Sequence, residues 1–203
     1  MTELDARAGV RVAGAKQVFN LPNNLTYGRL VAVPVVAALL LWGGNAARWV
    51  ALLIFIVAAI TDFFDGYLAR KWGQQSALGR MLDPIADKVL VAVILLVLAA
   101  DRTIFDWHIW AAIIILSREV LVSGLREFLA ELRVSVPVTR VAKWKTTVQL
   151  LAVGFLIAGP AGDKIMPYVS DIGLAGLWIA AALTLYTGYD YFRAGIGHVM
   201  DGK

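Results

Sequence analysis

The sequence predicts an all-α, polytopic membrane protein with six transmembrane helices. Hydrophobic residues make up 60% of the 203 positions and only 17% are charged, whereas about a quarter of the residues in a soluble domain are charged. The surplus apolar surface therefore requires lipid as well as a protein core. The apolar residues gather in six runs of the length that a helical span of about 20 residues needs. Basic residues are concentrated in alternate connections, as expected of a chain that crosses the membrane repeatedly.

The six predicted spans follow one another with short connections. They cover Leu25–Trp42, Trp49–Ala69, Leu78–Ala100, Ile109–Ala130, Thr139–Ala158 and Ile172–Phe192. Glycine, proline, asparagine and aspartate punctuate the gaps, for example GGN at 43–45 and GPAGDKIMP at 159–167. We therefore expect one membrane domain over residues 1–203, with the helix bundle at 19–198 and no separate soluble domain.

Residues 1–18 carry charges throughout and lack an apolar stretch of signal-peptide length, so they do not resemble a cleaved targeting segment. We expect a cytoplasmic juxtamembrane segment here, as an amphipathic helix on the membrane surface or as disordered chain. The sequence has no cysteine, which excludes disulfide frameworks, thiolate metal sites and cysteine nucleophiles.

The positions of the basic residues predict the orientation. They lie in the N-terminal segment, after the second span and between the fourth and fifth spans, as Arg7, Arg11, Lys16, Arg70, Lys71, Arg80, Arg133, Arg140, Lys143 and Lys145. The opposite connections hold Arg48, Arg102 and Lys164. By the positive-inside rule both termini are cytoplasmic, in agreement with an even number of spans. The basic face suits anionic lipid head groups, and nothing in the pattern indicates nucleic-acid binding.

Four aspartates stand where a membrane helix normally excludes charge. Asp62 and Asp65 lie toward the cytoplasmic end of the second span, and Asp83 and Asp87 lie in the first turns of the third. Ionised carboxylates at this depth are costly and normally face a polar cavity or a partner. Spacings of three and four residues place each pair on one helical face. Because the two spans are antiparallel neighbours, we expect the acidic faces to meet.

Four converging carboxylates cannot all stay ionised without cations. Oxygen ligands without histidine or cysteine favour Mg²⁺ or Mn²⁺, and two such ions would balance four negative charges. A two-metal site suits displacement at phosphorus. Two other interpretations stay open: the acids cap helix ends or pair with Arg70 and Lys88, or they line the pathway of a divalent-cation transporter.

Eight positions between Asp62 and Asp87 form the pattern D-x2-D-G-x2-A-R-x8-G-x3-D-x3-D. On this motif the chain resembles the CDP-alcohol phosphotransferase family, membrane enzymes with six spanning helices. The resemblance implies that the metal ligands are Asp62, Asp65, Asp83 and Asp87, and that Asp87 is also the catalytic base that deprotonates the acceptor hydroxyl. It implies that the cytidine diphosphate is bordered by Asn24, Thr26, Gly66, Arg70, Ser76 and Gly79.

Three further segments are similar to the phosphatidylglycerophosphate synthase branch of this family: NLPNNLTYGRLVAVP at 20–34, SREVLVSGLREFLA at 117–130 and KWKTTVQ at 143–149. They imply CDP-diacylglycerol as donor and sn-glycerol 3-phosphate as acceptor. A phosphorylated acceptor also fits the residue chemistry, because an arginine well inside a span needs a reason. The predicted pocket for the acceptor phosphate consists of Arg118, Arg126, Lys143 and Lys145.

Other readings of these basic residues remain. Arg118 pairs with Glu119 or Glu127 for purely structural reasons, or the two lysines are ordinary interfacial residues. Sister enzymes use serine, inositol phosphate or phosphatidylglycerol as acceptor. The resemblance further implies a homodimer in the bacterial inner membrane, in contact with membrane lipids and with its active site open to the cytoplasm.

Overall fold

The computed structural model describes residues 21–72, 77–132 and 140–200, so the predicted N-terminal segment at 1–18 lies outside the described residues. Inside the helices, the description also leaves out the side chains of residues 21–22, 63–72, 77–78, 80, 83, 140, 142–143, 194 and 196–200. In the described part the chain forms α2 Leu21–Trp42, α3 Asn45–Trp72, α4 Ala77–Ala100, α5 Ile109–Glu131, α6 Arg140–Asp163 and α7 Val169–Met200, with a short 3-10 helix at Asp106–His108. There is no strand in these ranges, and the all-α prediction is confirmed.

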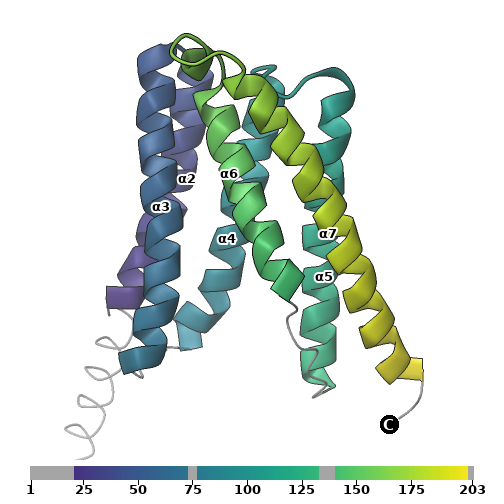
Figure 1. Cartoon of the computed structure of the whole chain (residues 1–203). Coiled ribbons are helices and arrows are strands. Elements are labelled where there is room, and N and C mark those ends of the chain that lie inside the picture. The colour runs from purple at the N-terminus through teal and green to yellow at the C-terminus, as the bar shows by residue number, and fades with distance from the viewer. Residues whose placement is uncertain (1–20, 73–76, 133–139, 201–203) are drawn as a thin grey trace, which may run out of the picture.

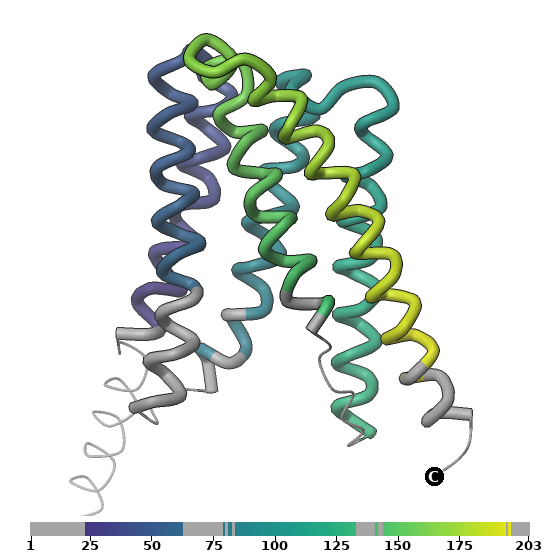
Figure 2. Tube along the Cα trace, in the orientation of Figure 1, coloured from purple at the N-terminus to yellow at the C-terminus, as the bar shows by residue number. Residues whose placement is uncertain are grey.

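The six helices alternate in direction, so that α2, α4 and α6 begin at the end where α3, α5 and α7 finish (Figures 1 and 2). We call this end, which is at the bottom of both figures, the lower end. At the upper end lie the turns between α2 and α3, α4 and α5, and α6 and α7. Helix α2 packs against α3 and α4, α6 packs against α3 and α7, and α5 packs mainly against α7.

Four of the described helices contain stretches long and apolar enough to cross a membrane by length and composition: Asn23–Trp42, Asn45–Asp62, Asp106–Glu131 and Val169–Arg193. The described residues thus form an apolar, all-helical protein with four candidate spans, and the count of six spans stays a prediction. Helices α4 and α6 carry polar residues within their N-terminal halves, Asp87 and Lys88 in α4 and Lys145 and Gln149 in α6. These residues reduce the apolar length of both helices.

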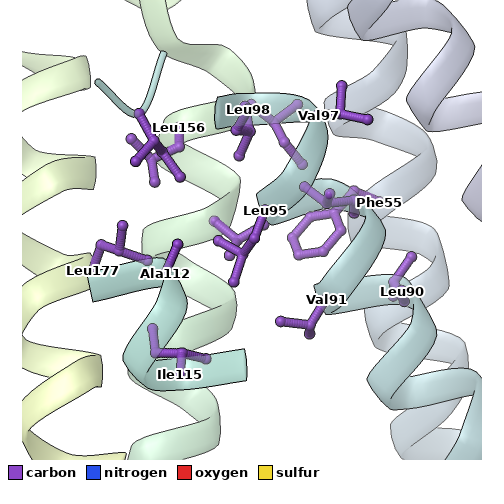
Figure 3. Packing of buried hydrophobic residues seen from close by; sticks show 14 of the residues in the cluster. Phe55, Leu90, Val91, Leu95, Val97, Leu98, Ala112, Ile115, Leu156 and Leu177 are labelled. Atoms are coloured by element: carbon purple, nitrogen blue, oxygen red, sulfur yellow. The ribbon is translucent and has the colours of Figure 1, made fainter. Parts of the chain in front are cut away.

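A layer of large apolar side chains fills the space between the helices (Figure 3). Leu95 of α4 is fully buried at its centre, close to Phe55 of α3 on one side and to Ile115 of α5 on the other. Leu156 of α6 and Leu177 of α7 complete this layer. In lipid, such contacts stabilise the bundle through close packing, because the surrounding acyl chains are as apolar as the side chains themselves.

The outer surface of the bundle is apolar as well. Large hydrophobic side chains on it, such as Leu53, Leu96, Val120 and Trp110, expose between 62% and 71% of their area. A soluble protein rarely exposes so continuous an apolar surface. The surface therefore fits the lipid environment that the composition predicts.

Helix α6 contains a kink that a buried arginine stabilises. Gly159 has a left-handed backbone with φ +40°, and Pro160 has no N–H to donate to the carbonyl of Leu156 four residues earlier. Arg48 of α3 supplies donors instead: its Nη1 lies 3.3 Å from the Leu156 oxygen and 3.2 Å from the Ile157 oxygen. The regular helical backbone of α6 thus ends at residue 158, where the predicted span ends, and a short helical segment continues beyond the kink to Asp163.

The same arginine also reaches the α4–α5 connection. Its Nη2 donates to the Thr103 hydroxyl at 2.7 Å and pairs with the Asp101 carboxylate. Close by in the upper end, Asp163 accepts hydrogen bonds from the backbone and hydroxyl of Ser170 at the start of α7. These bonds lower the pKa of Asp163, and they satisfy a backbone donor that a helix start leaves without an internal partner.

Candidate active site

Two of the four predicted aspartates meet over a buried arginine that comes from a third helix. Arg29 of α2 forms ion pairs through Nη1 with Asp62 of α3 and with Asp87 of α4. The two carboxyl groups also contact each other. The predicted convergence of the acidic faces of the second and third spans is therefore seen at these two residues.

The helix positions explain why these three residues meet. Arg29 lies eight residues after the start of α2, Asp62 ten residues before the end of α3, and Asp87 ten residues after the start of α4. At 1.5 Å per residue, all three lie about 12–15 Å from the lower ends of their helices. Helix α2 contacts both α3 and α4, so its inward face lies against both acidic faces.

The burial of the three side chains differs in a way that matters for chemistry. The Arg29 side chain is completely buried, whereas the carboxyl groups of Asp62 and Asp87 are 40% and 49% exposed. The arginine therefore holds both carboxylates from the protein side, while part of each side chain stays exposed. A buried cation without such partners would be costly, so the arginine and the acids hold one another in place.

The donor set suits a hard divalent cation. Carboxylate oxygens are the ligands that Mg²⁺ and Mn²⁺ prefer, and the open sides of Asp62 and Asp87 provide two of them. Asp65 and Asp83 belong to the same helices, one turn away, but their side chains lie outside the described residues. Among the described side chains no group of three or more potential ligands is found. The two aspartates seen together are thus compatible with half of the predicted ligand set.

The residues predicted to border the nucleotide divide into three groups. Thr26 and Gly79 are buried, and Thr26 stands one turn before Arg29 on the same face of α2. Asn24 is exposed, while the buried asparagine on the face of Thr26 is its neighbour Asn23. The side chains of Arg70 and Ser76, and the surroundings of Gly66, lie outside the described residues.

The residues predicted to bind the acceptor phosphate lie between α5, α6 and α7. Glu119 forms ion pairs with both Lys145 and Arg118, the latter at 3.5 Å. Arg118 also donates a hydrogen bond to the Thr187 hydroxyl at 3.0 Å. Arg126 is exposed, and its guanidinium carbon lies 5.7 Å from the ring centroid of Tyr191.

This arrangement bears on the two readings of Arg118. It makes the ion pair with Glu119 that a structural role requires, and it shares that carboxylate with a second predicted pocket residue. Structural pairing and phosphate binding are therefore not exclusive alternatives here. The side chain of Lys143, the fourth predicted pocket residue, lies outside the described residues.

Sequence reasoning missed Arg29, which is not part of the acidic motif. A signal for it was present, because an arginine inside an apolar run needs a buried partner. Its spacing of three residues from Thr26 also places it on the same helical face as that polar residue. What the sequence could not supply was the partner, since Asp87 lies 58 residues further along the chain.

Comparison with known proteins extends the resemblance to nearly the whole chain. Residues 19–186 match the family model described as CDP-alcohol phosphatidyltransferase. A protein of Rickettsia typhi is 47% identical over 175 residues, covering 86% of this chain and 96% of the relative. A Cereibacter sphaeroides protein is 41% identical over 219 residues, covering 91% and 99%, and one from Salmonella typhimurium is 40% identical over 185 residues, covering 90% and 98%. All three relatives are named CDP-diacylglycerol–glycerol-3-phosphate 3-phosphatidyltransferase.

Proposed function

The chain belongs to the CDP-alcohol phosphatidyltransferase family, and on that basis we propose that it transfers the phosphatidyl group of CDP-diacylglycerol to sn-glycerol 3-phosphate. The products are phosphatidylglycerophosphate and CMP. The observation that carries the proposal is the meeting of Asp62 and Asp87 over Arg29, within a motif typical of this chemistry. The names of the relatives and the cationic cluster around Glu119 support the choice of acceptor.

In the proposed reaction, Asp87 takes the proton of the acceptor hydroxyl as the hydroxyl oxygen attacks the lipid-side phosphorus. The bond from that phosphorus to the bridging oxygen breaks, and CMP leaves with the bonding electrons. Asp87 is suited to this role because half of its carboxyl surface is open while Arg29 holds the other side. A base must be held within hydrogen-bonding reach of the proton that it removes.

We further propose that Asp62, Asp65, Asp83 and Asp87 hold two Mg²⁺ or Mn²⁺ ions. Bound there, such ions neutralise the diphosphate and make the acceptor hydroxyl more acidic. The hard oxygen donors of Asp62 and Asp87, which meet at Arg29 and are both partly exposed, support this assignment.

The proposed setting is the inner membrane of a bacterium, where the enzyme forms a homodimer. Helices α4 and α6 complete six spans, and the lower end, with both termini and the active site, faces the cytoplasm. There the polar acceptor and the nucleotide have access to the carboxylates while the acyl chains of the donor stay in the bilayer. The basic residues of the cytoplasmic connections support this orientation.

The experiment that tests this function is an acceptor panel with purified protein. CMP release from CDP-diacylglycerol is measured with glycerol 3-phosphate, serine, inositol phosphate and phosphatidylglycerol. We expect release with glycerol 3-phosphate, and only when Mg²⁺ or Mn²⁺ is present. Release with another acceptor alone contradicts the acceptor assignment, and ion flux into liposomes without any turnover favours a transporter.

Within the same panel, the variant Asp87→Asn tests whether Asp87 is the catalytic base. This variant should bind CDP-diacylglycerol but release CMP with none of the acceptors. Asp163→Asn, at the exposed upper end, should behave like the unchanged enzyme. Substantial turnover by Asp87→Asn argues against Asp87 as the base.

A further inference from the structure

Glu119 joins two cations from different helices. Its Oε1 accepts a hydrogen bond from Lys145 Nζ of α6, and Arg118 Nη1 lies 3.5 Å from the same oxygen. Arg118 Nη2 also donates to Thr187 of α7. The side chains of Arg118, Glu119 and Lys145 are 13%, 21% and 8% exposed. The three charges therefore form one largely buried group that links α5, α6 and α7.

The group carries more positive than negative charge. Arg126, two turns further along α5, interacts electrostatically with both Arg118 and Lys145. Three cations against the single carboxylate of Glu119 leave two positive charges. A phosphate monoester dianion carries the opposite charge of the same size, and arginine and lysine are the side chains that bind such groups best.

Two buried polar atoms beside the group lack a hydrogen-bond partner among the residues that the structure describes. They are Arg118 Nε and Gln149 Oε1, and Gln149 follows Lys145 by one turn of α6. Buried polar atoms in folded proteins are nearly always paired. The unpaired donor Arg118 Nε, next to an excess of positive charge, suits an anionic oxygen, and the unpaired acceptor Gln149 Oε1 suits a hydroxyl group of the same molecule.

We propose that Glu119 is the positioning residue of the acceptor-phosphate pocket, an inference that rests on the proposed function. Arg118 and Lys145 repel each other, and a mostly buried lysine tends to lose its charge or move away unless a carboxylate stays beside it. Glu119 keeps both cations charged and in place before the acceptor arrives. Such preorganisation raises the affinity for the ligand although Glu119 itself touches no reacting atom.

The test is the variant Glu119→Gln, assayed as full-length enzyme with CDP-diacylglycerol and glycerol 3-phosphate. We expect the half-saturating concentration of glycerol 3-phosphate to rise about 10- to 100-fold, the effect of weakening charged hydrogen bonds. The half-saturating concentration of CDP-diacylglycerol should stay within about twofold, because Glu119 lies on α5, apart from the aspartate site. Glu119→Asp, which keeps the charge on a shorter side chain, should recover part of the loss.

Glu127→Gln is the matched control, because Glu127 is an exposed glutamate two turns further along the same helix. It should leave both half-saturating concentrations unchanged. An unchanged or lower requirement for glycerol 3-phosphate in Glu119→Gln overturns the proposal, since Glu119 would then compete with the phosphate for the cations. Equal increases for both substrates also overturn it, because they indicate general damage to the fold.

A failure of the proposed function itself gives a different result. In that case the unchanged enzyme releases no CMP with glycerol 3-phosphate, before any variant is compared. Binding of glycerol 3-phosphate without the donor lipid provides a second readout: it should raise the melting temperature of the unchanged enzyme and of Glu127→Gln, but not of Glu119→Gln. Glycerol, which lacks the phosphate, should raise none of them.

Discussion

Arg29 places a buried positive charge against two carboxylates that come from two other helices. Such a contact stabilises the protein only while all partners are present, because each charge is partly removed from water. It also limits where Asp62 and Asp87 can stand, since both are held at the same guanidinium nitrogen. The residue thus acts on the geometry of the site without belonging to the acidic motif.

We predict that Arg29→Gln destabilises the metal-free protein by about 1–3 kcal/mol, because it leaves two neighbouring carboxylates without their counter-charge. The cost is smaller than for a fully buried pair because both carboxylates are 40% or more exposed. Unfolding in detergent, followed by circular dichroism, measures the change.

Arg193→Gln is the control for this prediction, because Arg193 is an exposed arginine near the lower end of α7. It should change the stability by less than about 0.5 kcal/mol. If both variants are equally stable, the ion pairs of Arg29 contribute little to the fold.

At this scale the sequence predicted some contacts and not others. The meeting of Asp62 and Asp87 was predicted from the helical spacing of the two acidic faces. The prediction also took the two spans as direct neighbours, whereas among the described residues α2 packs against both and α3 and α4 do not pack closely on each other. The contact of Lys145 with Glu119 joins residues 26 positions apart on different helices. It depends on how α5 and α6 are rotated, and a single sequence does not give that rotation.

Helix α6 shows how a local break in a helix is accommodated. A glycine followed by a proline normally marks a connection, and the regular helical backbone does break at Gly159 before a short helical segment reaches Asp163. Arg48 stabilises this kink, because its donors reach the carbonyls of Leu156 and Ile157.

Helix α7 departs further from the prediction, because it continues to Met200, eight residues beyond the predicted end at Phe192. Where an end is set locally the prediction holds: α2 ends at Trp42 as predicted, before Gly43 and Gly44 with their positive φ.

We predict that Gly159→Ala destabilises the protein by about 1–3 kcal/mol through backbone strain alone, because its φ of +40° disfavours a side chain. The new Cβ would also lie 2.8 Å from Arg48 Nη1 and push the guanidinium away from its partners. Thermal unfolding in detergent measures the loss.

Gly124→Ala in α5 is the matched control, since a Cβ at Gly124 meets nothing within 4 Å. Alanine is the better helix former by about 1 kcal/mol, so this variant should be as stable as the unchanged protein or slightly more stable. A Gly159→Ala variant with the same melting temperature as Gly124→Ala refutes the role of the kink.

On the scale of the whole molecule, the alternating helices separate the two ends chemically. The aspartate site lies toward the lower end and the Arg48 cluster at the upper end, with the apolar layer around Leu95 between them. The sequence predicted this division from the distribution of basic residues. It could not predict which helices are neighbours, for example that α3 packs against α6, because no local pattern records such pairing.

The absence of cysteine allows a direct test of the proposed orientation. Single cysteines are introduced at Gly44, Arg102 and Lys164, one in each upper turn, and at Glu131 at the lower end. In spheroplasts, a membrane-impermeant thiol reagent should label the first three, and Glu131→Cys only after the membrane is permeabilised. Labelling of Arg102→Cys from the opposite side to Gly44→Cys would show that α3 and α4 do not both cross the membrane.

The partners of Arg48 also have a consequence for the order in which the chain is made. When α3 leaves the ribosome, Arg48 has no partner in the sequence already synthesised; Asp101 follows 53 residues later, and the carbonyls of Leu156 and Ile157 more than 100 residues later. The upper end of α3 therefore stays without its final contacts until the fifth of the described helices is in place. Until Asp101 is synthesised, the nascent chain holds a charge that only water and lipid head groups can solvate, and from then until α6 is made the carbonyl partners of Arg48 are still missing.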